Sequence, residues 1–120
     1  MANLATRVSV TITVPNDATA HSLFTLISAI QPICPIRTRW MTLQVPSTSA
    51  GTLLVGDGPK NEDGTTNPAA LTSTNVGLSI AAGAAIEYFY GISDADFTLT
   101  KFYVLASGGA ATVNVQIIRA

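Results

Sequence analysis

The feature that most constrains this chain is the two-residue alternation of apolar and polar side chains near both ends of the sequence. From Thr6 to Val14, valine or isoleucine occupies every second position, with polar residues between them. Val113–Ile117 repeats the pattern, with Asn114 and Gln116 as its polar members. Because successive side chains of a strand point to opposite faces, this pattern predicts half-buried β-strands.

Shorter segments between these two continue the strand pattern and are separated by turn-forming residues. We predict strands over Arg37–Val45, Gly51–Gly56, Val76–Ile80 and Ile86–Tyr90. The last segment, Phe97–Arg119, contains two strands joined by a Ser-Gly-Gly-Ala-Ala turn. We expect these two strands to pair as a hairpin, because glycine adopts the positive φ angles that tight turns require.

One short helix is expected near the N-terminus. Its apolar positions recur at three- and four-residue spacing: Leu23, Phe24, Ile27 and Ile30. Asp17 is available as its N-cap, and Gln31 with Pro32 ends it. About seven short strands and one helix favour an all-β fold, an antiparallel sandwich or barrel, as a single domain over residues 1–120. A parallel β/α fold is disfavoured, since helices do not alternate with the strands.

The composition points towards assembly. Charged residues make up only 11% of the 120 residues, against about 25% in an average soluble domain. Hydrophobic residues account for an ordinary 48%, so the missing charges are replaced by small and neutral polar residues. Such a surface is poorly protected against adhesion to other surfaces. A chain of this kind packs into an assembly or functions outside the crowded cytosol.

The charge balance argues against nucleic acid as a partner. The net charge is −1, and the six basic residues are spread over the chain. Arg37 and Arg39 share a strand face but do not form a basic patch. The longest nearly apolar stretch, Val76–Ile86, is too short to span a membrane, and the N-terminus lacks the pattern of a signal peptide. We expect a soluble protein made in the cytosol, without nucleic-acid or membrane contacts.

The sequence offers little for catalysis. We expect Cys34, the one cysteine, to pack as a small apolar residue, and His21 to be a solvated residue of the helix face. Asp94 and Asp96 are typical of a turn, and Glu87 is a carboxylate of raised pKa, a rim charge or an arginine's partner. Nucleophile-elbow, P-loop and dinucleotide motifs are absent. We therefore expect neither an enzyme nor a bound cofactor or metal.

The long polar loop DGPKNEDGTTNPA fails as a calcium site. Counted from Asp57, the third, sixth and twelfth positions are Pro59, Glu62 and Pro68, where an EF-hand loop needs a ligand, a glycine and a glutamate. A solvated loop is expected, although long exposed loops often carry contacts. Three of its residues are therefore weaker candidates for partner contact: Asp57, Lys60 and Asn61.

Three large aromatic residues have parity opposite to the other apolar residues of their strands: Trp40, Phe89 and Phe102. Trp40 lies beside Thr38 and Thr42 on a polar face, where another element covers it or a partner contacts it. Phe102 and Val104 would lie in water on a monomer, and a symmetric oligomer would cover such groups. We therefore expect an obligate homo-oligomer.

Three stretches together resemble the small β-sandwich virion proteins of tailed bacteriophages, particularly capsid decoration (cement) proteins. They are LLVGDG at 53–58, TNVGLSIAAGAAIEY at 74–88 and FYVLASGGAATVNVQI at 102–117. The resemblance implies a jelly-roll-like domain, usually trimeric, that sits on the outer capsid lattice and stiffens it. Its partners would be the major capsid protein or another virion protein. Its location would be the capsid surface, after synthesis in the host cytoplasm.

Two other interpretations remain open. A carbohydrate- or receptor-binding module of a phage tail or fibre tip would use exposed aromatics beside amides and carboxylates, and Trp40, Tyr88 and Tyr90 are its candidates. A capsid or filament subunit is the third interpretation. It ranks lower because 120 residues is small for a tailed-phage shell protein.

Overall fold

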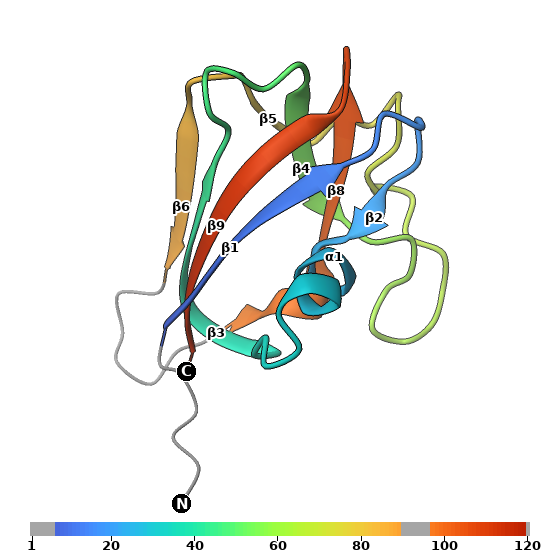
Figure 1. Cartoon of the computed structure of the whole chain (residues 1–120). Coiled ribbons are helices and arrows are strands. Elements are labelled where there is room, and N and C mark those ends of the chain that lie inside the picture. Colours follow the sequence, from blue (N-terminus) through green and yellow to red (C-terminus); the bar gives the residue numbers. More distant parts are fainter. Residues whose placement is uncertain (1–6, 90–96, 120) are drawn as a thin grey trace, which may run out of the picture.

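Two antiparallel β-sheets face each other in the computed structural model, which describes residues 7–89 and 97–119 (Figure 1). The first sheet has the strand order β1 (Arg7–Val14), β9 (Ala111–Arg119), β3 (Arg37–Gln44) and β6 (Ala85–Phe89), and the short β7 (Phe97–Thr98) pairs with the start of β3. The second sheet has the order β2 (His21–Ser22), β8 (Phe102–Ser107), β4 (Thr52–Asp57) and β5 (Leu78–Ile80). One helix, α1 (Leu23–Ile30), and a 3₁₀ turn, η1 (Leu99–Lys101), complete the described elements.

This strand order is that of a jelly roll. With β7 set aside, eight strands divide into two four-stranded sheets, and the chain passes between the sheets at most of its connections. Neighbours within each sheet are distant in sequence, as in the double Greek key of jelly rolls. The expected all-β, jelly-roll-like antiparallel sandwich is therefore confirmed. The strands are more numerous than the expected seven because β2 and β7 have only two residues each.

The core lies between the sheets and follows the alternation of the sequence. In β1, Val8, Ile12 and Val14 are buried, whereas the residues between them are exposed or half-buried. The inner residues of β3, β4, β8 and β9 join them in one apolar cluster. Leu23 and Ile27 of α1 are fully buried in the same cluster, so the helix is part of the core wall.

The Phe97–Arg119 segment does contain two strands and a Gly-Gly turn, but they do not form a hairpin. β8 pairs with β2 and β4 in the second sheet, whereas β9 pairs with β1 and β3 in the first. Gly108 and Gly109 have positive φ angles of 80° and 154°, so the turn is tight, and it passes from one sheet to the other. The hairpin prediction is wrong. Each of the two strands has an apolar face to bury, and placing them in opposite sheets lets these two faces pack against each other in the core.

The start of α1 also differs from the expectation. Ser22 is the N-cap, and its hydroxyl accepts a hydrogen bond from the Thr25 backbone N–H. Asp17 instead bonds to His21 and accepts from the Thr19 backbone N–H. Ser22 ends a strand immediately before the first helical residue, where a short hydroxyl side chain can satisfy a free backbone donor.

The long segment between β4 and β5 covers the outer face of the second sheet. Leu71, 4% exposed, packs there on Leu54 and Leu105, with Tyr103 at the edge of the cluster. Its backbone N–H donates to the carbonyl of Asp57 at 2.9 Å, which fixes the segment against the end of β4. The chain itself therefore covers apolar residues on both faces of β4 and β8.

Candidate interaction surfaces

Trp40 lies on the outer face of the first sheet, where it is half-buried. A register shift at Arg39 turns Thr38 into the core, so Trp40 shares its face with Thr42 but not with Thr38. The expectation that all three share one face is wrong, because the bulge changes the parity within β3. The side-chain oxygen of Thr38 is fully buried and has no hydrogen-bond partner among the described atoms.

The indole of Trp40 has a polar partner on the neighbouring strand. Its Nε1–H donates to Oε2 of Glu87 in β6 at 2.6 Å. Glu87 is exposed, and its carboxylate is paired with the indole. One interpretation of the sequence had given it an arginine as its partner. This bond holds the indole in a defined orientation on the sheet surface.

Towards the end of the first sheet that lies away from Trp40, the outer face is polar and uncharged. Thr11 Oγ1 donates to Asn114 Oδ1 at 2.8 Å, and Asn114 Nδ2 donates to Gln44 Oε1 at 3.1 Å. These bonds link side chains of β1, β9 and β3 across the sheet. The outer face therefore presents ordered amide and hydroxyl groups at one end, and Trp40 with Glu87 and Arg7 at the other.

The other two aromatic candidates differ from Trp40. Phe89 pairs with Trp40 through its backbone register, and its side chain lies outside the described residues. Phe102 is half-buried, and its ring contacts Tyr88 edge-to-face with centroids 5.0 Å apart. Val104 is fully buried in the core. The expectation that Phe102 and Val104 lie in water is wrong, because both point between the sheets. Tyr90, Asp94 and Asp96 lie outside the described residues.

The polar-loop residues predicted to contact a partner line a hollow of about 480 Å³, located where β4 ends and β8 begins. Asp57, Lys60 and Asn61 contribute to its wall, together with Tyr103 and Lys101. The ring of Tyr103 lies so close to Gly58 that a Cβ there would meet ring carbon Cε1 at 2.5 Å. The hollow thus combines a half-buried aromatic ring with charged and amide side chains.

Hydrogen bonds within the loop hold this wall in place. Asn61 Nδ2 donates to Thr65 Oγ1 at 3.0 Å, and Asn67 Nδ2 donates to the Gly58 carbonyl at 3.0 Å. Asp63 accepts from the side-chain hydroxyl and the backbone N–H of Thr65, which lowers the pKa of its carboxyl. Lys101 reaches over from η1 to Glu62 at 3.5 Å. The loop is solvated, as expected, but locally ordered.

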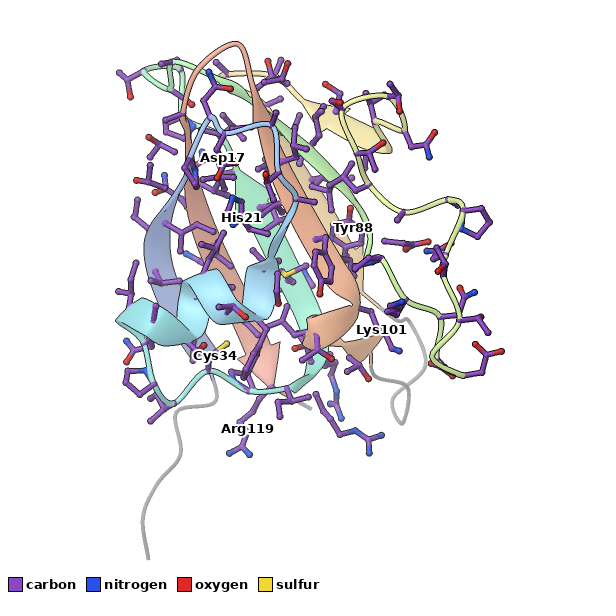
Figure 2. All side chains as sticks on the ribbon, turned by 90° about the vertical axis from the view of Figure 1, so that its right-hand side faces the viewer. Asp17, His21, Cys34, Tyr88, Lys101 and Arg119 are labelled. Carbon is purple, nitrogen blue, oxygen red and sulfur yellow. The ribbon has the colours of Figure 1, made fainter. Side chains whose placement is uncertain are left out.

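His21 is not the unpartnered helix residue that the sequence suggested. It lies in β2, and its Nε2 is 2.9 Å from Oδ2 of Asp17 (Figure 2). The hydrogen bond from His21 lowers the pKa of the exposed Asp17 carboxyl, and the Thr19 backbone bond adds to the effect. The sequence pattern alone favours Asp17 as a helix cap, so it gives no signal of this pairing.

Cys34 is buried at the edge of the core, as predicted. Burial raises the pKa of its thiol to about 11, so it is protonated at neutral pH and a poor nucleophile. Among residues 7–89 and 97–119, no group of three His, Cys, Asp or Glu side chains could hold a metal ion. In the same part of the chain, no helix is long and apolar enough to cross a membrane.

The four arginines are spread over the sequence but lie at one end of the first sheet in the fold. Arg7 pairs with Ile118, Arg119 pairs with Thr38, and Arg37 and Arg39 flank Thr38. All four arginines of the chain thus lie on the ends of three neighbouring strands, and we call this region the arginine end. The sequence does not reveal this region, because these residues come together only through the register of β1, β9 and β3.

Comparison of the chain with protein-family models and with curated proteins gives no match.

Proposed function

We propose that this chain is a structural virion protein of the capsid decoration type, which binds the outer capsid lattice as a homo-oligomer, with a trimer favoured. The observation that carries the proposal is the half-buried Trp40 on the outer face of the first sheet, level with Ile118 of β9 and Arg7 of β1. The jelly roll supports it by analogy, since viral capsid domains share this architecture with lectins and cupins. The resemblance of the sequence to decoration proteins points in the same direction.

Trp40 is half-buried on the outer face of the first sheet, which we call the Trp40 face. A tryptophan is the residue type most enriched among interface hot spots, and neutral hydroxyl and amide groups are cheaper to desolvate than charges. The Glu87 bond holds the indole ready for contact, so little side-chain entropy is lost on binding. Such a face suits a permanent contact with a neighbouring subunit or with the lattice.

Location and assembly are separate tests. Immunogold labelling of intact viral particles should place the chain on the head, and labelling confined to the tail or absent from particles would refute the decoration role. Analytical ultracentrifugation should show an oligomer, and a stable monomer at low micromolar concentration would refute the assembly.

A variant tests the Trp40 face itself. Trp40→Ala should weaken subunit or capsid association by about tenfold or more, while thermal unfolding shows that the variant stays folded. Thr13→Ala, an exposed position at the far end of β1, is the matched control and should associate normally. If Trp40→Ala unfolds but assembles whenever it is folded, Trp40 is a packing residue and not a contact.

The hollow beside β8 favours one second candidate, a carbohydrate-binding module. Sugar sites place an aromatic ring beside amides and carboxylates, and the hollow brings Tyr103 together with Asn61, Asn67 and Asp57. A glycan array separates the two functions, because a decoration protein should stay silent. Binding to one glycan class that Asn61→Ala abolishes would support the module, and Thr13→Ala again serves as the control.

A further inference from the structure

In the part of the chain that the structure describes, the arginine end carries more positive charge than the acidic residues of its sheet balance. Among the described residues, Arg7, Arg39 and Arg119 have no ion-pair partner, whereas Arg37 already interacts within the chain. The inference therefore rests on the first three. Neighbouring strands are about 4.8 Å apart, so the backbones of these residues lie close together at one end of the sheet, with Arg7 on its outer face and Arg119 opposite the buried Thr38.

Among residues 7–89 and 97–119, negative charge is sparse near these groups. In the described parts of the first sheet's strands, the one acidic residue is Glu87, and its carboxylate accepts the Trp40 indole N–H. Asp17 lies towards the opposite end of the molecule from Arg119 (Figure 2). The two lysines, Lys60 and Lys101, belong to the loop and to η1.

An exposed apolar segment leads directly into this end. Ile30, Ile33 and Ile36 are 57%, 53% and 51% exposed, the highest values among the described large hydrophobic residues. Ile30 is the last residue of α1, and Ile33 and Ile36 belong to the connector between α1 and β3, which begins at Arg37. We call these three residues the isoleucine segment.

The isoleucine segment is held in place rather than free to fold inward. Cys34, at its middle, is buried and donates its backbone N–H to the Gln31 carbonyl at 3.0 Å. The carbonyl of Ile36 accepts from the backbone N–H of Leu99 at 2.7 Å. With Cys34 anchored inward, the isoleucines on either side are kept in solvent.

We propose that the arginine end and the isoleucine segment form one docking surface for an acidic protein surface. Guanidinium groups pair with carboxylates in a bidentate manner, and exposed isoleucines gain by burial against apolar side chains. A phosphate backbone would use the arginines but leave the isoleucines without an apolar partner, so the combination fits a protein better than nucleic acid. Resting on the proposed function, the partner is an acidic patch of the capsid shell.

Co-sedimentation with capsids assembled without this chain tests the docking surface. Arg7→Glu with Arg39→Glu should weaken binding by about tenfold or more, and wild-type binding should fall as salt rises. The control, Ser79→Glu with Ser107→Glu at exposed positions of the second sheet, adds negative charge in another region and should bind normally. Ile33→Ser should also weaken binding. Val76→Ser, which makes the same kind of apolar-to-polar change at a residue 46% exposed, should not.

The outcomes separate this inference from the proposed function. If wild-type chain binds capsids and the arginine variant binds equally well, the docking surface is wrong while the decoration role stands. If wild-type chain does not bind capsids, the decoration role fails. The surface is then judged by NMR titration of the ¹⁵N-labelled chain with poly-L-glutamate.

In that titration, amide shifts centred on the three strand ends and the isoleucine segment support an acidic protein partner. Absent shifts, or shifts centred elsewhere, overturn it. A parallel titration with a random DNA duplex provides the remaining comparison. Tighter binding of the duplex than of poly-L-glutamate at equal ionic strength would reassign the surface to nucleic acid and overturn the inference.

Discussion

Replacing Leu71 by alanine tests whether the chain covers its own second sheet. Leu71 is 4% exposed and packs on Leu54 and Leu105, although it lies in a long loop. Leu→Ala changes in protein cores cost about 2–5 kcal/mol, and a loop can relax into part of the space left behind. We therefore expect the lower part of that range, a loss of about 2–3 kcal/mol in the free energy of unfolding.

The expected change in melting temperature follows from the length of the chain. Unfolding entropy is about 2.1 cal/mol/K per residue, so over the 120 residues 1 kcal/mol corresponds to about 4 °C. Leu71→Ala should lower Tm by about 8–12 °C in calorimetry. The m-value, which is the slope of the unfolding free energy against urea concentration, should also fall if the loop lifts off the sheet in the folded state. Less surface would then be newly exposed on unfolding.

Val76→Ala is the matched control, because Val76 belongs to the same segment and is 46% exposed. It should change the unfolding free energy by less than about 0.5 kcal/mol. If Leu71→Ala is as mild as this control, the loop is not a structural cover. A Tm that rises steeply with protein concentration in wild-type chain but not in Leu71→Ala would also contradict the reasoning, because another subunit would then complete the cover.

Three further predictions concern single polar groups. Thr38→Val should stabilise the fold by about 1 kcal/mol in urea unfolding, because it removes a buried hydroxyl that has no partner among the described residues, and a loss of stability would point to a partner that bonds it. The depressed pKa of Asp17 means that its contribution to stability is present above the ordinary value of 3.8 and is lost as pH falls through the folded pKa. In His21→Ala, NMR titration should move the Asp17 pKa back towards 3.8, and an unchanged value would contradict the assigned cause. The Cys34 thiol, with its pKa raised to about 11, should react with iodoacetamide at pH 8 far more slowly in folded than in urea-unfolded chain, and equal rates would show that it is accessible.

Periodicity predicted most strands but not which strands pair. The alternation in β1 and β9 predicted their buried faces, because a half-buried strand records its surroundings in its own sequence. A tight turn such as Gly108-Gly109 serves a hairpin and a crossing between sheets equally well. The choice depends on whether Ala106 and Val113 lie side by side or face each other across the core, and that is decided by the whole chain.

The surfaces were harder to predict than the fold. The arginine end exists only through strand register, which no local pattern specifies. The cover over the second sheet did leave a signal, since Leu71 is the one large apolar residue between Val55 and Val76. Trp40 was placed on the outer face correctly, but the bulge that turns Thr38 inward has no marker in the residues around it.

The pairing of Arg7 with Ile118 has a consequence for engineering the molecule. The chain enters the sandwich through β1 and leaves it through β9 on adjacent strands, so a cargo fused before β1 or after β9 would crowd the arginine end. The Gly108-Gly109 turn lies at the other end of β9; Gly109 packs on Ala50, but Gly108 is exposed with open space around it, so an insertion at Gly108 is tolerated better. A peptide or enzyme inserted there would project away from the arginine end, which makes that turn the position of choice for displaying cargo.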